Sequence, residues 1–175
     1  MKKNSGFTLV EILVAVSIFL ILIFSVFAAM GVGTRAGFSG DTSVEVRQEI
    51  IKAFMTMEKE LKVTRPSQID LRSGTTNTTL TFKLPQDNNG DGTILDAGGN
   101  VEWSGNITYA LNNANQITRT AAGVTRILSH DIMSLLFTRT ATSVDLLQID
   151  ITAQKVSAAR RTIQDSGQIT IRMRN

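Results

Sequence analysis

The sequence predicts an α+β fold in which a long amino-terminal helix packs on an antiparallel β-sheet. An uncharged apolar run near the start is long enough to cross a membrane, and an amphipathic helical pattern follows it. After Pro66, short segments alternate between apolar and polar residues, as strands with one buried face do. The 175 residues allow one domain of ordinary size plus a membrane segment, and they exclude two full domains.

The composition excludes several classes of function. The 18 Lys and Arg and 15 Asp and Glu residues give a net charge of +3, and the basic residues are scattered, so we expect no specific nucleic-acid binding. The absence of Cys excludes disulfides, thiolate zinc sites and cysteine nucleophiles, and the single His130 cannot form a two-histidine zinc motif. Asp131 follows His130 directly, and adjacent strand residues point to opposite faces, so we predict no catalytic relay and no enzyme.

The apolar run predicts a membrane helix. Residues 12–30 contain no charge, and only Ser17 and Ser25 are not apolar. Counted from Phe7, the run has 24 residues. At about 1.5 Å of rise per residue it forms a helix of about 36 Å, against a hydrocarbon core of about 30 Å.

The charges around the run predict its orientation. Lys2 and Lys3 precede it, and the next basic residue is Arg35. Because positive charge is retained on the cytoplasmic side, residues 1–6 are expected in the cytoplasm and the rest of the chain in the periplasm or outside the cell.

Two fates of this run are open. An ordinary signal peptide would be removed, and the small residues Val26, Ala28 and Ala29 permit such a cut. Glu11 argues against removal, because a charge at the membrane centre costs about 2.5–3.5 kcal/mol, and somewhat less near the edge. A disposable signal has no need of that carboxylate.

The segment from Gly6 to Glu11 reads GFTLVE, follows a short Lys-containing leader and precedes the apolar run. It resembles the processing site of type IV prepilins and the related pseudopilins. In that family a dedicated peptidase cuts after the glycine, the new terminal residue is N-methylated, and the helix is retained for assembly. The resemblance implies cleavage between Gly6 and Phe7, methylation of Phe7, and Glu11 as the fifth residue of the mature chain.

The resemblance also implies a function and a set of partners. The chain is expected to be a structural subunit, a minor pilin or pseudopilin, of a type IV pilus or type II secretion filament. Its expected partners are prepilin peptidase, other pilin or pseudopilin subunits, an inner-membrane assembly platform and membrane lipid. Glu11 is expected to pair with the free amine of a neighbouring subunit. The alternative is a secreted or membrane-anchored β-rich binding module with an ordinary signal peptide.

The same resemblance, with the local patterns, divides the chain into a leader (1–6), a transmembrane assembly helix (7–30), a hinge with an amphipathic helix (31–65) and a β-rich head (66–175). Four glycines between residues 31 and 40 each cost about 1 kcal/mol in a helix interior. They predict a hinge or melted stretch, with a plain linker as the alternative.

Helical periodicity is expected to resume at Asp41, with Asp41, Thr42 or Ser43 as the cap. Apolar residues then recur every three or four positions and predict one buried helix face. These residues are Val46, Ile50, Phe54, Met57 and Leu61.

Short strands are predicted over the rest of the chain, joined by connections that suit antiparallel pairing in one sheet. The predicted strands are 79–84, 107–111, 116–120, 124–128, 146–152 and 168–173. Two further segments, 132–137 and 153–161, are ambiguous between strand, turn and short helix.

The segment from Asp87 to Asp96 predicts a calcium site. Asp87, Asn89 and Asp91 place oxygen ligands at the first, third and fifth positions, and a glycine follows at the sixth, as in a calcium loop. The twelfth position is a glycine instead of glutamate, so the loop would close through Asp96 with the Thr93 carbonyl as a further ligand. The alternative is a turn rich in residues that tolerate left-handed backbone geometry.

Four other residues have simpler interpretations. Trp103 and Tyr109 are expected in the core or the sheet. Asn77 and Asn106 fit the short acceptor pattern for N-glycosylation.

Overall fold

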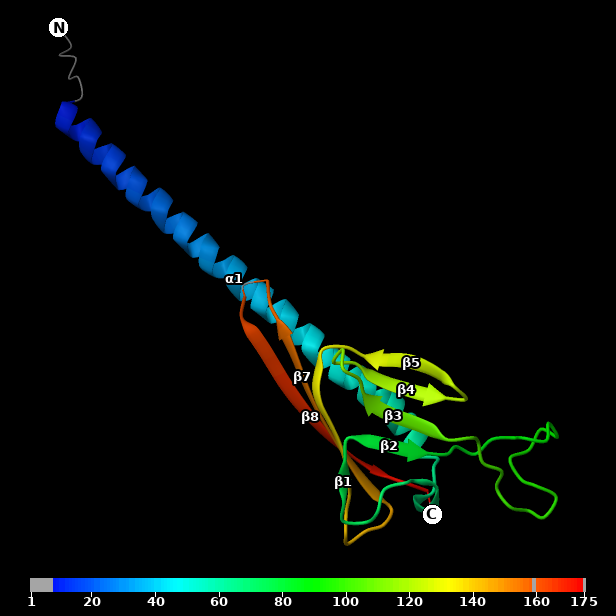
Figure 1. The fold of residues 1–175 in the computed structure, drawn as a ribbon. Coiled ribbons are helices and arrows are strands. Elements are labelled where there is room, and N and C mark those ends of the chain that lie inside the picture. Colours follow the sequence, from blue (N-terminus) through cyan, green and yellow to red (C-terminus); the bar gives the residue numbers. More distant parts are fainter. Residues whose placement is uncertain (1–7, 159, 175) are drawn as a thin grey trace.

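The computed structural model describes residues 8–158 and 160–174, apart from the side chains of residues 32–39, and confirms the α+β fold. One long helix, α1 (Leu9–Leu61), has 53 residues. Its first half stands clear of the rest of the chain, and its second half lies against the strands (Figure 1). A short 3-10 helix, η1 (Pro66–Gln68), follows it and leads into the sheets.

The helix runs without a break through the glycine-rich segment. The melted stretch and the plain linker predicted for residues 31–40 are therefore both wrong, and so is the new cap predicted at Asp41, Thr42 or Ser43. Nucleating a helix is costly, whereas extending one adds a hydrogen bond for each residue ordered. Because both flanks are strongly helical, continuing through the glycines costs less than ending the helix and starting another.

The second half of α1 buries the predicted apolar face. Val46, Ile50, Met57 and Leu61 are buried, and Phe54 packs half-buried against the same core. The opposing core residues come from both sheets, so this helix face holds the head together.

The strands form two four-stranded antiparallel sheets, where the sequence predicted one. The orders are β1-β6-β7-β8 and β2-β3-β4-β5, which we call the first and the second sheet. Thr78 alone separates β1 from β2, yet β1 pairs with β6 and β2 with β3. Alternation predicts which side chains face the core, but it does not tell which strands pair. The strands are β1 (Thr76–Asn77), β2 (Thr79–Phe82), β3 (Ile107–Leu111), β4 (Ile117–Ala121), β5 (Val124–Ser129), β6 (Ile132–Arg139), β7 (Leu146–Val156) and β8 (Thr162–Arg172).

The first ambiguous segment is strand, and the second is part strand and part turn. Residues 132–137 lie in β6. In segment 153–161, the first four residues complete β7, and a turn follows in which Arg160 has a φ of 57°. Ala159 lies outside the described residues.

Gly167 allows α1 to approach β8 closely. A Cβ built on Gly167 would lie 2.8 Å from Cε2 of Phe54 and 2.9 Å from Cγ2 of Ile50. Contacts below 3.0 Å essentially do not occur for real Cβ atoms. The missing side chain therefore determines how deeply the helix sits on the first sheet.

Candidate functional site

The exposed apolar surface of α1 is the most prominent feature of the molecule. Leu9–Gly31 spans 23 residues, its most apolar 18-residue window has a mean hydropathy of 3.0, and none of that window is buried within the chain. A helix of a soluble protein that is apolar on every face is normally buried. This segment has the length and composition to cross a membrane, which fits membrane anchoring.

The two serines of this segment have local hydrogen-bond partners. The Ser17 hydroxyl donates to the Leu13 carbonyl oxygen at 2.8 Å, and the Ser25 hydroxyl donates to the Ile21 carbonyl oxygen at 2.7 Å. An unsatisfied polar group is costly in lipid, so these bonds make both serines compatible with the hydrocarbon core.

Glu11 lies in the first turn of α1 and forms a capping box with Thr8. Its Oε2 accepts from the Thr8 backbone N–H at 3.0 Å and from the Thr8 hydroxyl at 3.1 Å, and the Glu11 N–H donates to Thr8 Oγ1 at 3.3 Å. Two free donors at the helix start are thus satisfied within one subunit. The T-x-x-E spacing that signals a capping box is present in the sequence, although this pair was not predicted.

The predicted processing residues, Gly6 and Phe7, lie outside the described residues. Thr8 and Glu11 are both retained if the chain is cut between Gly6 and Phe7. Removal of a leader therefore leaves the capping box intact and places a free amine one residue before it.

Comparison with known proteins identifies this amino terminus. Residues 1–31 match the family model of the prokaryotic N-terminal methylation motif. The chain carries the prepilin-type motif of type IV pilins and pseudopilins. The motif implies processing by prepilin peptidase and assembly with other pilin subunits, and it points to a structural subunit rather than an enzyme. It covers the amino terminus only, and searches of curated proteins and of solved structures found no match.

The predicted calcium residues lie in an exposed loop between β2 and β3. Asp87 accepts from the backbone N–H groups of Gly90 at 2.7 Å and Gly92 at 2.9 Å. Asp91 accepts from the Thr93 hydroxyl and backbone N–H, both at 2.8 Å, and these bonds hold the pKa of Asp91 below its usual range. Asn89 also bonds to Asp91, at 3.0 Å. Hydrogen bonds within the loop thus already engage these oxygens.

Asp96, the residue expected to close the calcium loop, belongs to a separate turn. Its Oδ1 accepts from the N–H groups of Gly98 and Asn100, both at 2.8 Å, and the Asn100 bond lowers the pKa of Asp96 most. Among the described residues, no three His, Cys, Asp or Glu side chains lie close enough to hold a metal ion. The calcium site stays a prediction, and an ion would have to displace existing hydrogen bonds.

His130 and Asp131 bond to different residues beside α1. The His130 N–H donates to Glu49 Oε2 at 2.8 Å, and Lys155 pairs with Glu45 at 3.0 Å and with Asp131 at 3.5 Å. The Glu45 carboxylate raises the pKa of Lys155. These contacts link α1 to the turn after β5 and to β7, and the nearby Ser129 hydroxyl donates to a backbone carbonyl of α1 instead of to His130.

A second link lies inside the head and was not predicted. Glu60 of α1 accepts from the Tyr109 hydroxyl at 2.5 Å and from Arg119 Nε at 3.0 Å. Tyr109 is fully buried, as expected. Burial is the main cause that raises the pKa of Tyr109, and the Glu60 carboxylate raises it further. Trp103 is half-buried, and Arg65 lies 5.8 Å from its ring centroid. Glu60 thus joins the helix to the second sheet.

Proposed function

We propose that the chain is a minor pilin or pseudopilin, a structural subunit of a type IV pilus or type II secretion filament. Prepilin peptidase cuts it between Gly6 and Phe7, and Phe7 is then N-methylated. The subunit spans the inner membrane once with its head in the periplasm. It then leaves the membrane by packing α1 among the helices of other subunits at an assembly platform.

The exposed apolar half of α1 is the observation that carries this proposal. Its 23 residues bury nothing within the chain, so they need either lipid or other apolar helices around them. The same surface can exchange lipid for neighbouring helices without a change in its own conformation. Because the helix continues into the head, such packing also positions the head.

Glu11 is proposed to serve in recognition between subunits. In a single chain its carboxylate is held at the helix end by Thr8. Processing creates an amine at Phe7, and a neighbouring subunit can present that amine to Glu11. The attraction between the two charges is strong in a medium of low dielectric constant, and it favours one axial offset between adjacent helices.

The intact mass of the protein from membranes tests the processing step. Removal of six residues from 175 leaves 169, with one added methyl group on Phe7. Without prepilin peptidase the full-length chain should accumulate. A chain that begins after Ala28 would refute the proposal and favour the alternative, a β-rich module with an ordinary signal peptide.

Glu11→Ala tests the assembly step. We expect normal cleavage in membranes and little or no variant chain in sheared filaments. Glu58→Ala is a matched control, because Glu58 is also on α1 but pairs with Lys62 outside the membrane segment. Equal incorporation of the two variants would contradict a role of Glu11 in assembly, whereas the mass measurement would still report processing.

A further inference from the structure

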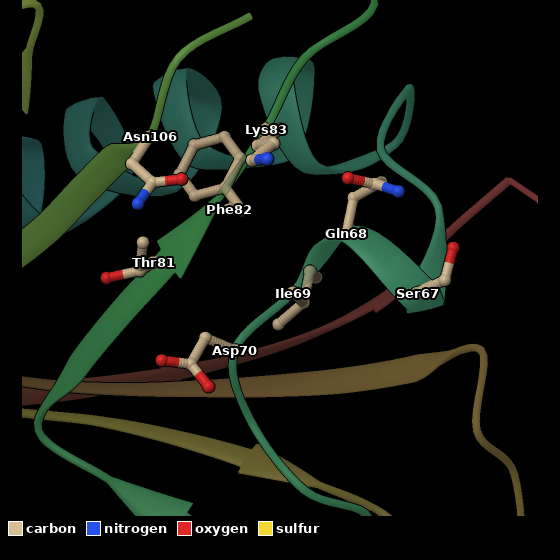
Figure 2. A pocket seen from close by; sticks show the side chains of 8 residues that line it. All are labelled: Ser67, Gln68, Ile69, Asp70, Thr81, Phe82, Lys83 and Asn106. Carbon is tan, nitrogen blue, oxygen red and sulfur yellow. The ribbon is translucent and has the colours of Figure 1, made fainter. Parts of the chain in front are cut away.

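The long loop between β2 and β3 contains a pair of residues with a chemistry of its own. The loop leaves the sheet at Lys83 and returns at Asn106, which Figure 2 shows at the ends of the two neighbouring strands. Its base is fixed by hydrogen bonds. The Gln86 N–H donates to the Glu102 carbonyl oxygen at 3.0 Å, and the Asn88 N–H donates to the Glu102 carboxylate at 2.6 Å. The tip of the loop therefore stands on a fixed base.

The only Asn-Gly pair in the sequence, Asn89-Gly90, lies at this tip. An asparagine side chain is labile when the next backbone nitrogen can attack its amide carbon, Cγ. Glycine permits this attack best, because it has no Cβ to obstruct the approach. A Cβ built on Gly90 would meet no heavy atom within 4 Å, and both residues are exposed. Neither burial nor a neighbouring side chain therefore hinders ring closure.

The backbone nitrogen of Gly90 faces a carboxylate. Its N–H donates to Oδ1 of Asp87 at 2.7 Å, and Oδ2 of Asp87 accepts from the Gly92 N–H at 2.9 Å. The second bond fixes the carboxylate in place. A backbone nitrogen is a poor nucleophile until it loses its proton, and Asp87 lies where it can accept that proton as the new bond forms.

The side-chain amide of Asn89 is held by Asp91 through both of its polar atoms. Oδ1 accepts from the Asp91 N–H at 2.9 Å, and Nδ2 donates to Asp91 Oδ2 at 3.0 Å. The bond to Oδ1 stabilises the negative charge that develops on this oxygen when Cγ is attacked, as donors in an oxyanion hole do. The bond from Nδ2 keeps the amide from rotating. The loop thus supplies a base, an oxyanion donor and an oriented amide.

We propose that Asn89 is a site of self-modification, at which Gly90 and Asp87 convert its amide into a carboxylate. The Gly90 nitrogen bonds to Cγ of Asn89 and passes its proton to Asp87. The bond from Cγ to Nδ2 then breaks, and this nitrogen takes up the proton through solvent and leaves as ammonia. One water molecule opens the resulting succinimide ring and gives aspartate or isoaspartate. Because the attack is intramolecular, no enzyme is needed.

The conversion would change the loop permanently. It replaces a donor nitrogen 3.0 Å from the Asp91 carboxylate with a second negative charge, and like charges at that distance repel. The bonds between Asn89 and Asp91 are then lost, and old copies of the chain differ from new ones in charge at this tip. The inference does not depend on entry into a filament.

Peptide mapping by tandem mass spectrometry tests the inference. The full chain is kept in detergent micelles at neutral pH and digested at successive times, and a zero-time sample corrects for conversion during digestion. Conversion raises the mass of the peptide that contains Asn89 by about 1 Da. We expect a rate at least about tenfold higher in the folded chain than in the same chain unfolded in guanidinium chloride. An equal or lower rate in the folded chain would overturn the inference.

Asp87→Asn separates the base from the hydrogen bond. An amide oxygen at this position can still accept from the Gly90 N–H, but it is a far weaker base than a carboxylate. We therefore expect conversion of Asn89 to slow by at least about tenfold, since a positioned base contributes about 10²–10⁴-fold. An unchanged rate in this variant would overturn the inference.

A second Asn-Gly pair without a carboxylate is the matched control. Ala114→Gly places a glycine after Asn113 in another exposed turn, where the N–H of residue 114 donates to an amide oxygen, Asn112 Oδ1, at 2.9 Å. Both pairs then age in one folded chain, and we expect Asn89 to convert at least about tenfold faster than Asn113. Similar rates at the two asparagines would overturn the inference. This comparison leaves the loop of Asn89 unaltered, so it stays decisive if Asp87→Asn distorts that loop.

Discussion

Replacing Gly167 by alanine tests how closely α1 is seated on β8. The new Cβ would lie 2.8 Å from the Phe54 ring and 2.9 Å from Ile50 Cγ2, whereas ordinary contact begins at 3.4 Å. The end of the Phe54 ring can swing aside. Ile50 is β-branched and has one strongly preferred rotamer in a helix, so relief requires helix and strand to separate by about half an ångström.

The expected magnitude follows from two opposing effects. Overpacking a core costs about 1–3 kcal/mol, and replacing glycine by alanine inside a strand returns about 0.5–1 kcal/mol. We expect Gly167→Ala to lower the free energy of unfolding by about 1–2 kcal/mol. For a chain of this size, that lowers the melting temperature by about 3–6 °C. Thermal unfolding of the full chain in detergent micelles, followed by circular dichroism of the β-sheet, measures the change.

Gly105→Ala is the matched control. A Cβ at Gly105 meets no heavy atom within 4 Å, and its φ is not positive. The control should melt within about 1 °C of the parent chain. Equal melting temperatures for the two alanine variants would refute the close seating of α1 on β8.

Three further predictions concern the head. Glu60→Gln removes the charge that Arg119 and the buried Tyr109 hydroxyl share, so we expect a loss of about 1.5–3 kcal/mol in denaturant unfolding. Arg172 donates to Asp145 at 2.8 Å and lowers the pKa of Asp145. The stability that this pair contributes is present above the unfolded pKa of about 3.9, and it is lost as the pH falls through the lower pKa of the folded state. As the pH is lowered from 6 to 2, the melting temperature of Asp145→Asn should therefore fall less steeply than that of the parent chain. If the calcium prediction holds, millimolar CaCl₂ raises the melting temperature of the parent chain and not of Asp91→Asn, whereas equal curves with CaCl₂ and EDTA contradict it.

The sequence predicted most elements of the fold because their signals are local. Alternation marked β2 and β3, further strand candidates covered β4, β5, the start of β7 and the end of β8, and helical spacing marked the buried face from Val46 to Leu61. β6 stayed ambiguous because its sequence, IMSLLFTR, does not alternate strictly. Pairing with the next strand, β7, and with β1, which is distant in sequence, makes it a strand.

Two features of the candidate sites could not be predicted from local signals. The continuity of α1 depends on the helical flanks of the glycine segment, whereas helix propensity describes each glycine without its neighbours. The arrangement of residues across the second sheet depends on register: Thr81, Thr108, Thr120 and Thr125 come from four strands, and only the pairing of these strands aligns them. The capping box of Thr8 and Glu11 differs, since its T-x-x-E spacing is itself a local signal in the sequence.

One side of α1 connects the membrane half to the head. The side of α1 that the sheets leave uncovered exposes Val44, Ile51 and Met55, which continue the apolar surface of the membrane half toward the head. Neighbouring subunits that pack along α1 would cover this side. Because α1 is one continuous helix, packing of its membrane half would also set the orientation of the head on each copy of this subunit.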